Sequence, residues 1–279
     1  MPELPSIGET SCASVLVVDD DAALRAVMAR HFSLRGAGVW TAGTVGEAID
    51  TMQRQRIDVL VADYRLPGTD GLVLLDIARQ RWPEVTRGLV TGEHASDILI
   101  EALNTDRAQV LALKPLTPER FPMFADDLLA MARNRDAPHA PGPAHVLWVD
   151  DEPAMVAIGR RALAGHDVQM TGASTLAEAR RILSCGPVDV LVADAVLPDG
   201  YGIHLLERAR SRHGSVVRAI CSGRLDDDAV LMATDRGGVQ RILHKPLEPN
   251  DIRRLVGSLV PRCADPAAPH QPGSARMPS

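Results

Sequence analysis

The sequence repeats itself once, at a constant offset of 131 residues, and no other feature limits the possible folds as strongly. The run Asp58–Asp63 (DVLVAD) returns unchanged as Asp189–Asp194. Further matched pairs are Val15–Asp20 with Val146–Asp151, Leu66-Pro67 with Leu197-Pro198, Gly71 with Gly202, and Thr91-Gly92 with Ser222-Gly223. No insertion or deletion separates the first pair from the last. A period this long indicates tandem whole domains rather than a solenoid of small repeats.

The only two lysines of the chain obey the same offset. Lys114 stands in Leu113-Lys114-Pro115-Leu116 and Lys245 in His244-Lys245-Pro246-Leu247, while the other positive charges are 28 arginines. Lysine carries a compact ammonium on a thin stem, whereas arginine carries a broad planar fork. We therefore expect a site in each repeat that needs an ammonium.

Composition shifts divide the chain into two large and three small segments. The length suits two domains that each bury a core. The predicted segments are a flexible leader (1–13), a first domain (14–133), a Pro-rich linker (134–143), a second domain (144–260) and a disordered tail (261–279) rich in Pro, Ala, Ser and Gly.

Charge and cysteine usage exclude several classes of protein. The formal net charge is −6 and no basic block occurs, which argues against nucleic acid or an anionic membrane as the partner. No apolar run approaches the length of a membrane span. The first residues lack a basic stretch followed by an apolar one, so we expect no secretory signal. The four cysteines lack metal-site spacing and do not follow the repeat, so we expect free thiols and a cytoplasmic protein.

Short apolar runs alternate with amphipathic segments in each repeat. Strands are expected at 15–18, 59–62, 89–90 and 110–113, and helices at 22–32, 46–52, 72–78 and after Thr117, with Thr117 as N-cap and Pro118 at the first helical position. Strands that are apolar on both faces belong in a parallel sheet covered by helices. The alternation predicts a doubly wound α/β fold for each repeat.

The repeated polar residues all follow predicted strands, where an open parallel sheet collects its functional groups. In the first repeat, Asp19 and Asp20 follow the expected strand at 15–18. Asp63 follows the expected strand at 59–62, and Lys114 follows the one at 110–113. Carboxylates gathered in one place repel one another unless a cation compensates them. An oxygen-rich, water-accessible site of this kind suits Mg²⁺, with Mn²⁺ as a substitute.

Such a site can handle a phosphoryl group. An Asp carboxylate can act as nucleophile and form an acyl phosphate, while a cation and a lysine offset the charge on the phosphoryl oxygens. Asp63 and Asp194 are the expected nucleophiles, because each stands alone at a strand end before a loop with Pro and Gly. Each polar residue alone could be a cap, turn or surface charge, but the full set occurs twice in one order.

With these residues, both repeats resemble the receiver domain of bacterial two-component response regulators. The resemblance implies two tandem, flavodoxin-like receivers, each with a five-stranded parallel sheet. It also implies the following roles: Asp63 and Asp194 as phosphoacceptors; Thr91 and Ser222 as switch hydroxyls; Lys114 and Lys245, each before a cis proline, as phosphoryl-binding residues; and Asp19, Asp20, Asp63 and the Arg65 carbonyl, with Asp150, Asp151, Asp194 and the Val196 carbonyl, as Mg²⁺ ligands. Asp20 and Asp151 would bind the ion directly, and Asp19 and Asp150 mostly through water.

The sequence departs from the family at one position in each repeat. The family usually has an aromatic switch residue three positions before the lysine, and here those positions hold Leu111 and Ile242. The coupled movement of hydroxyl and ring therefore cannot operate in its usual form. The two sites also differ from each other at Arg65 versus Val196 and at Glu93 versus Arg224, from which we hypothesise different lifetimes for the two phosphates.

These observations lead to one preferred function and two alternatives. We expect a stand-alone tandem-receiver regulator that takes phosphoryl groups from a histidine kinase or phosphotransfer protein and signals to a downstream protein, as relay intermediate, switch or phosphate sink. It would not turn over an external substrate, and it could form a homodimer. The first alternative is a partly or wholly non-phosphorylated receiver-type adaptor, in which one domain or both serve docking or dimerisation. The second is a Mg²⁺-dependent phosphatase, which the absence of a further acidic pair near the nucleophile disfavours.

Overall fold

The protein is described here by a computed structural model. It describes residues 12–92, 96–136, 142–212, 216–223, 227–247, 250, 252–253 and 255. Most of the predicted leader, half of the predicted linker and the whole predicted tail lie outside these residues, and the domain boundaries stay a prediction. In this part of the chain, no helix is both long and apolar enough to cross a membrane.

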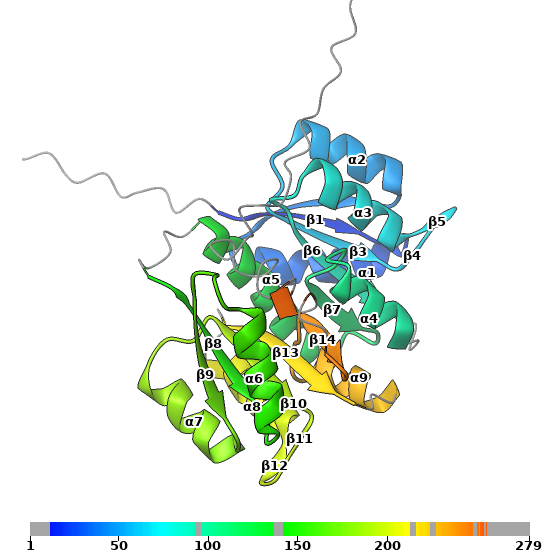
Figure 1. The fold of residues 1–279 in the computed structure, drawn as a ribbon. Coiled ribbons are helices and arrows are strands. Elements are labelled where there is room, and N and C mark those ends of the chain that lie inside the picture. Colours follow the sequence, from blue (N-terminus) through cyan, green and yellow to red (C-terminus); the bar gives the residue numbers. More distant parts are fainter. Residues whose placement is uncertain are drawn as a thin grey trace, which may run out of the picture.

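The first unit, from β1 to α5, is a parallel sheet covered by helices on both faces (Figure 1). Its elements are β1 (Ser14–Val18), α1 (Ala22–Ser33), β2 (Gly38–Ala42), α2 (Val45–Arg54), β3 (Val59–Asp63), β4 (Arg65–Leu66), β5 (Thr69–Asp70), α3 (Gly71–Arg81), β6 (Thr86–Thr91), α4 (Ser96–Asn104), β7 (Val110–Leu113) and α5 (Arg120–Asp136). The strand order of the five-stranded sheet is β2-β1-β3-β6-β7, and every pairing in it is parallel.

The second unit, from β8 to β14, repeats this arrangement. Its elements are β8 (Ala144–Val149), α6 (Pro153–Ala162), β9 (Val168–Ala173), α7 (Leu176–Cys185), β10 (Val190–Asp194), β11 (Val196–Leu197), β12 (Gly200–Tyr201), α8 (Gly202–Arg212), β13 (Val217–Ser222), α9 (Asp227–Asp235) and β14 (Arg241–His244). The sheet order β9-β8-β10-β13-β14 matches the first unit strand for strand. The predicted fold class, two doubly wound five-stranded parallel sheets, is confirmed.

Local sequence explains most of these elements. The five residues of β3 are all buried, as expected of a central strand with helices on both faces. The side chains of Asp21, Thr44 and Asp70 accept backbone hydrogen bonds at the starts of α1, α2 and α3. The predicted helix after Thr117 begins two residues later than expected, at Arg120, whose N–H donates to Thr117 Oγ1 at 3.3 Å.

The sequence pattern did not predict four elements of the first unit, which are the two-residue strands β4 and β5, the edge strand β2 and helix α4. The edge strand β2 has mostly half-buried residues, so it lacks the continuous apolar run of the central strands. Helix α4 turns its apolar residues toward the second unit, and a contact between distant segments leaves no local signal. Cys12, Cys185 and Cys221 are free thiols, as predicted, whereas Cys263 lies outside the described residues.

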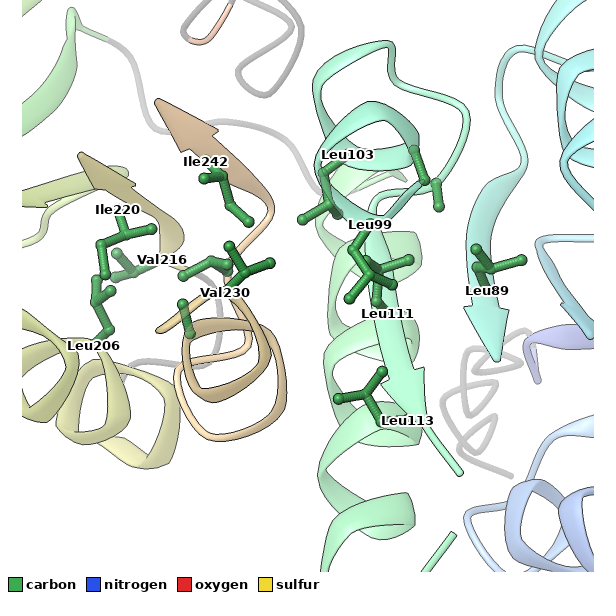
Figure 2. Packing of buried hydrophobic residues seen from close by; sticks show 14 of the residues in the cluster. Leu89, Leu99, Leu103, Leu111, Leu113, Leu206, Val216, Ile220, Val230 and Ile242 are labelled. Atoms are coloured by element: carbon green, nitrogen blue, oxygen red, sulfur yellow. The ribbon is translucent and has the colours of Figure 1, made fainter. Parts of the chain in front are cut away.

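The two units pack against each other through corresponding edges. Strands β7 and β14 are the outer strands of their sheets, and α4 contacts β14 while α9 contacts β7. Figure 2 shows the apolar side chains of this contact, with Leu99, Leu103 and Leu111 on one side and Val230 and Ile242 on the other. All of them are buried. Full burial of a side chain of this size is worth roughly 1.5–3 kcal/mol relative to exposure, and packing within its own unit supplies part of it.

Candidate functional site

The register of the parallel strands brings the repeated acids together at one edge of each sheet. In the first unit Val18 pairs with Ala62, so Asp19 and Asp63, the next residues, lie side by side. In the second unit Val149 pairs with Ala193, which places Asp150 beside Asp194 in the same way. Both pairs therefore sit at the carboxyl ends of central strands, as the sequence predicted.

Three carboxylates meet at each of these edges. In each set, one oxygen per residue lies within 4.8 Å of the others; the sets are Asp19, Asp20 and Asp63, and Asp150, Asp151 and Asp194. Asp19 and Asp150 are buried, whereas Asp20 and Asp151 are exposed. Each set thus has a water-accessible side, and its oxygen donors are those that Mg²⁺ or Mn²⁺ prefers.

Lys114 lies within the first acidic set. Its Nζ is 2.9 Å from Asp63 Oδ1 and 3.3 Å from Asp19 Oδ2. One ammonium against three carboxylates leaves a formal charge of −2 (+1 − 3). Burial raises the pKa of Asp63, the hydrogen bond from Lys114 opposes this rise, and the charge of Asp19 adds to it. Burial by itself would lower the pKa of Lys114, but its bonds to the two carboxylates outweigh burial and raise it.

Lys245 occupies the same place in the second set. Its Nζ lies 3.0 Å from Asp194 Oδ2 and 3.0 Å from Asp150 Oδ2. The Asp150 contact is close enough for an ion pair, yet this buried oxygen lacks a hydrogen bond of good geometry. Burial raises the pKa of Asp194, as it does that of Asp63. In both sets the uncompensated negative charge and the free carboxylate lone pairs fit a divalent cation.

The hydroxyl-bearing residues also lie next to the acids. Asp63 pairs with Val90, so Thr91 is one position further along the neighbouring strand. Thr91 pairs with Leu113 in turn, and its carbonyl accepts the Lys114 N–H at 2.8 Å. Ser222 has the same relation to Lys245 in the second unit. Both side chains are buried.

The remaining predicted positions lie in the loops that flank the acids. Arg65 and Val196 begin the short strands β4 and β11, two residues after the central aspartates. The bonds Lys114–Pro115 and Lys245–Pro246 are both cis, as expected. The hypothesis of different phosphate lifetimes also invoked Glu93 and Arg224, which lie outside the described residues.

Two contacts of the sites were not predicted from the sequence. The guanidinium of Arg25 donates from Nη1 to the carbonyl oxygen of Asp19, and the residue 131 positions later is Val156. Glu152 Oε1 lies 3.8 Å from Lys245 Nζ, whereas the corresponding Asp21 caps helix α1 with its side chain. The break in the repeat at these positions was the available signal. The distance from Glu152 to Lys245 places one more carboxylate near the second site than near the first.

Leu111 and Ile242 replace the aromatic residue that the family usually has, and both are buried between the two units. Figure 2 shows Leu111 on β7 and Ile242 on β14, within the apolar cluster that joins the units. These two positions therefore belong to the contact between the repeats rather than to an open surface.

The sequence profile of the response regulator receiver domain matches this chain twice, at residues 15–123 and 146–257. The two matched ranges together cover well over half of the chain, and each coincides with one unit of the fold.

Individual relatives match one unit at a time. The hydrogenase transcriptional regulatory protein HoxA of Cupriavidus necator is 34% identical over 113 residues, which are 39% of this chain and 22% of that protein. The transcriptional regulatory protein AruR of Pseudomonas aeruginosa is 33% identical over 135 residues, which are 47% of this chain and 54% of that protein. The chain thus spans from about a fifth to about half of the length of these relatives.

A solved structure similar to one unit is the CheY-like response regulator receiver domain protein of Methanospirillum hungatei JF-1. It is 26% identical, covers 45% of this chain and 94% of its own, and has a TM-score of 0.38.

Proposed function

Because the chain belongs to the response regulator receiver domain family and contains two such domains in tandem, we propose that it accepts phosphoryl groups on Asp63 and Asp194. The donor is a histidine kinase or phosphotransfer protein of a two-component system, and the output is a change in binding to a downstream protein. The protein would act in the cytoplasm as switch, relay intermediate or phosphate sink, without turnover of an external substrate. The observation that carries this proposal is the pocket of three carboxylates and one lysine that both units contain.

The chemistry follows from the positions of the side chains. A carboxylate oxygen of Asp63 or Asp194 forms a bond to phosphorus, while the bond from phosphorus to the donor nitrogen of phosphohistidine breaks. The nitrogen leaves with the electron pair and takes up a proton. Lys114 or Lys245 moves from its carboxylate partners to a phosphoryl oxygen, because the new acyl phosphate carries the charge that the ammonium must offset. Thr91 or Ser222 donates its hydroxyl proton to a second oxygen.

A divalent cation, Mg²⁺ or Mn²⁺, would be held in the first receiver by Asp19, Asp20, Asp63 and the Arg65 carbonyl. In the second receiver Asp150, Asp151, Asp194 and the Val196 carbonyl would hold it. When bound, the ion supplies positive charge against the phosphoryl oxygens. The formal charge of −2 at the first site is the observation that fits this ion.

The first experiment is intact mass spectrometry of the full chain after incubation with acetyl phosphate and Mg²⁺. Parent protein, Asp63→Asn, Asp194→Asn and the control Asp50→Asn are compared, because Asp50 is an exposed helix residue paired only at 4.0 Å with Arg54. We expect two phosphoryl groups on the parent and the control, and one on each pocket variant.

The adaptor alternative remains the competing outcome of this experiment. It is favoured by one observation, the burial of Leu111 and Ile242 between the units, because the surface that usually changes on phosphorylation is already occupied. Cation binding with no phosphoryl uptake, also from a phosphorylated histidine phosphotransfer protein, would establish the adaptor and reject the proposed chemistry. A single phosphoryl group would restrict the proposal to one receiver.

A further inference from the structure

An asparagine of the first unit binds the backbone of the strand that carries Lys245 in the second unit. Asn104 Nδ2 donates to the carbonyl oxygen of Ile242 at 2.7 Å, and Asn104 Oδ1 accepts the Ile242 N–H at 3.2 Å. Strand β14 is the outer strand of its sheet, and an outer strand presents peptide groups that lack a strand partner. The amide of Asn104 satisfies both groups of one residue, as a neighbouring strand would.

The placement of β14 decides where the ammonium of the second site lies. The strand has only four residues and ends at His244, directly before Lys245. Ile242 is three positions before that lysine, and two hydrogen bonds are a large share of what a strand this short can make. Movement of β14 would shift the lysine Nζ relative to Asp150 and Asp194, each 3.0 Å away.

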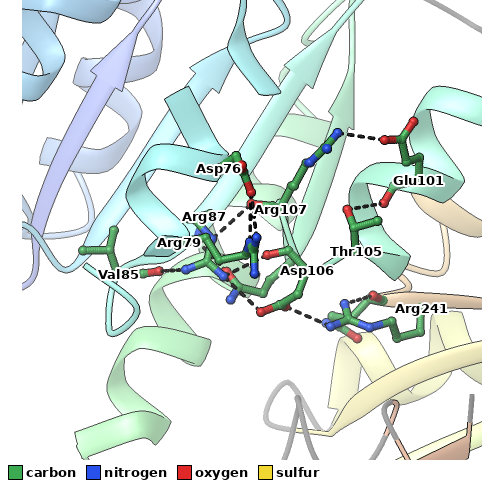
Figure 3. A network of polar contacts seen from close by, with 11 residues as sticks. Asp76, Arg79, Val85, Arg87, Glu101, Thr105, Asp106, Arg107 and Arg241 are labelled. Carbon is green, nitrogen blue, oxygen red and sulfur yellow. Dashed lines mark hydrogen bonds and ion pairs between the residues drawn. The ribbon is translucent and has the colours of Figure 1, made fainter. Parts of the chain in front are cut away.

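The helix that carries Asn104 is fixed by packing, although Asn104 itself is exposed. Asn104 is the last residue of α4, and Leu99 and Leu103 of that helix are fully buried in the cluster between the units. Beside it, Asp106 Oδ1 accepts from Arg241 Nη2 at 2.8 Å, and the same carboxylate pairs with Arg87 of its own unit (Figure 3). The first residue of β14 is thus also held by the first unit.

The residue of the second unit that corresponds to Asn104 makes a different contact with the first unit. The residue 131 positions after Asn104 is Asp235, whose carboxylate pairs with Arg120 at 3.1 Å. An ionised carboxylate accepts hydrogen bonds but cannot donate to a carbonyl oxygen, so Asp235 could not make the pair of bonds that Asn104 makes. The two contacts between the units, Asn104 with Ile242 and Asp235 with Arg120, are therefore unequal. Of these two, only the Asn104 contact reaches the strand that precedes a pocket lysine.

We propose that Asn104 is a positioning residue for phosphoryl transfer to Asp194: by binding both peptide groups of Ile242, the first receiver holds β14 so that Lys245 meets the phosphoryl oxygens. This inference rests on the proposed function, because it concerns the rate of that reaction. It makes the second receiver dependent on the first for its full reactivity.

The test uses the full chain with Asp63→Asn as background, so that Asp194 is the pocket nucleophile that remains. With acetyl phosphate, an Asp194 oxygen bonds to phosphorus, the bond from phosphorus to the acetyl oxygen breaks, and acetate leaves with the electron pair. The variants are Asn104→Leu, which keeps the branched shape and the number of side-chain heavy atoms but loses both bonds, and Asn104→Asp, which keeps only the bond from the Ile242 N–H.

We expect Asn104→Leu to lower the rate of phosphoryl uptake at Asp194 about tenfold, because two partly buried hydrogen bonds are lost together, with a smaller decrease for Asn104→Asp. The Mg²⁺ concentration for half-maximal rate should stay within about twofold, because the carboxylates are not moved. Hydrogen exchange at the Ile242 amide should become faster in Asn104→Leu, a readout that does not depend on phosphoryl chemistry.

Two controls separate positioning from general loosening of the contact. Asp235→Ala removes the ion pair to Arg120 between the same two units, and it should leave the Asp194 rate within about twofold. With Asp194→Asn as background, Asn104→Leu should leave uptake at Asp63 unchanged, which also shows that the variant is folded.

Each failure has a distinct signature. An unchanged rate in Asn104→Leu, or an equal decrease in Asp235→Ala, would overturn the inference and leave the proposed function intact. No uptake at Asp194 in the Asp63→Asn parent would instead reject the proposed function of the second receiver, and the role of Asn104 in the reaction with it.

Discussion

At the scale of single residues, the two lysines show how a chain rich in arginine reserves a different cation for one task. Each ammonium lies between two carboxylates, and the distances at Lys245 are both 3.0 Å. A small rotatable cation can leave such a pair and follow a phosphoryl oxygen, whereas a guanidinium binds carboxylates through a rigid fork.

We therefore predict that Lys245→Arg keeps the fold but lowers phosphoryl uptake at Asp194 by about tenfold or more, and that Lys245→Ala lowers it further. Uptake rates by intact mass, with Asp63→Asn as background, measure this effect. Arg54→Lys is the matched control, because Arg54 is a strongly exposed helix residue. A Lys245→Arg protein with the parent rate would refute the need for an ammonium.

Single residues also make the two sites different from each other. Val196 stands where the first site has Arg65, and Glu152 adds a carboxylate 3.8 Å from Lys245. A negative charge near the acyl phosphate disfavours an incoming anion and changes the approach of water. We predict different decay rates of the two phosphates, measured after removal of the donor on Asp63→Asn and Asp194→Asn. Equal decay in the two variants would contradict the prediction.

At the scale of elements, the first glycine of α3 and of α8 decides how closely the helix start approaches the central strand. A Cβ at Gly71 would lie 1.9 Å from the Asp63 carbonyl oxygen, and one at Gly202 would lie 2.0 Å from that of Asp194. The backbone of the nucleophile is thus in direct contact with the start of the next helix. Glycine is required here for space rather than for its backbone angles.

Gly71→Ala should therefore destabilise the protein by about 3 kcal/mol or more and reduce uptake at Asp63, since backbone atoms must move apart. Gly46→Ala is the control, because a Cβ there meets nothing within 4 Å inside helix α2. That change should stabilise by about 0.5–1 kcal/mol. Urea unfolding measures both free energies, and a neutral Gly71→Ala would show that α3 can shift freely.

At the scale of the whole molecule, buried charges join the two units. The carboxylate of Asp127, on α5, lies 2.8 Å from Arg218 Nη2 and 2.8 Å from Arg210 Nη2 of the second unit. Arg218 is fully buried and Asp127 is 5% exposed, so neither charge can turn to water. Burial lowers the pKa of the Arg218 guanidinium, and the charge of Asp127 opposes that shift.

We predict that Asp127→Ala lowers the free energy of unfolding by about 3–5 kcal/mol, because it leaves buried guanidinium groups without a counter-charge. It should also separate the unfolding of the two units into two transitions. The neighbouring Asp126→Ala is the control: Asp126 is 64% exposed and pairs with Arg35 of its own unit, so its loss should cost less than about 1 kcal/mol. Calorimetry measures both variants, and equal costs would refute the interface argument.

The fold class, the number of domains and the place of the acidic pockets could be predicted from the sequence alone. The repeat predicted two domains, apolar runs and amphipathic segments predicted the α/β class, and residues placed after strands predicted the two acidic pockets. These inferences succeed because they rest on local periodicity and on one general property of parallel sheets, whose carboxyl ends meet at one edge. Even so, Glu152 next to Lys245 and Arg25 next to Asp19 were missed, since side-chain reach has no periodic signal.

Only the tertiary structure decided how the two domains lie against each other. Arg218 and Arg241 look like surface charges in the sequence, yet both are buried, and Asn104 gives no sign that it binds the backbone of Ile242. The partners in that last contact are 138 residues apart. Such a contact depends on the complementary shapes of two folded units, which arise only after each unit has packed its own core. Patterns along the sequence do not reveal how two folded units pack together. This packing places residues of the first unit next to the strand that leads to the second site.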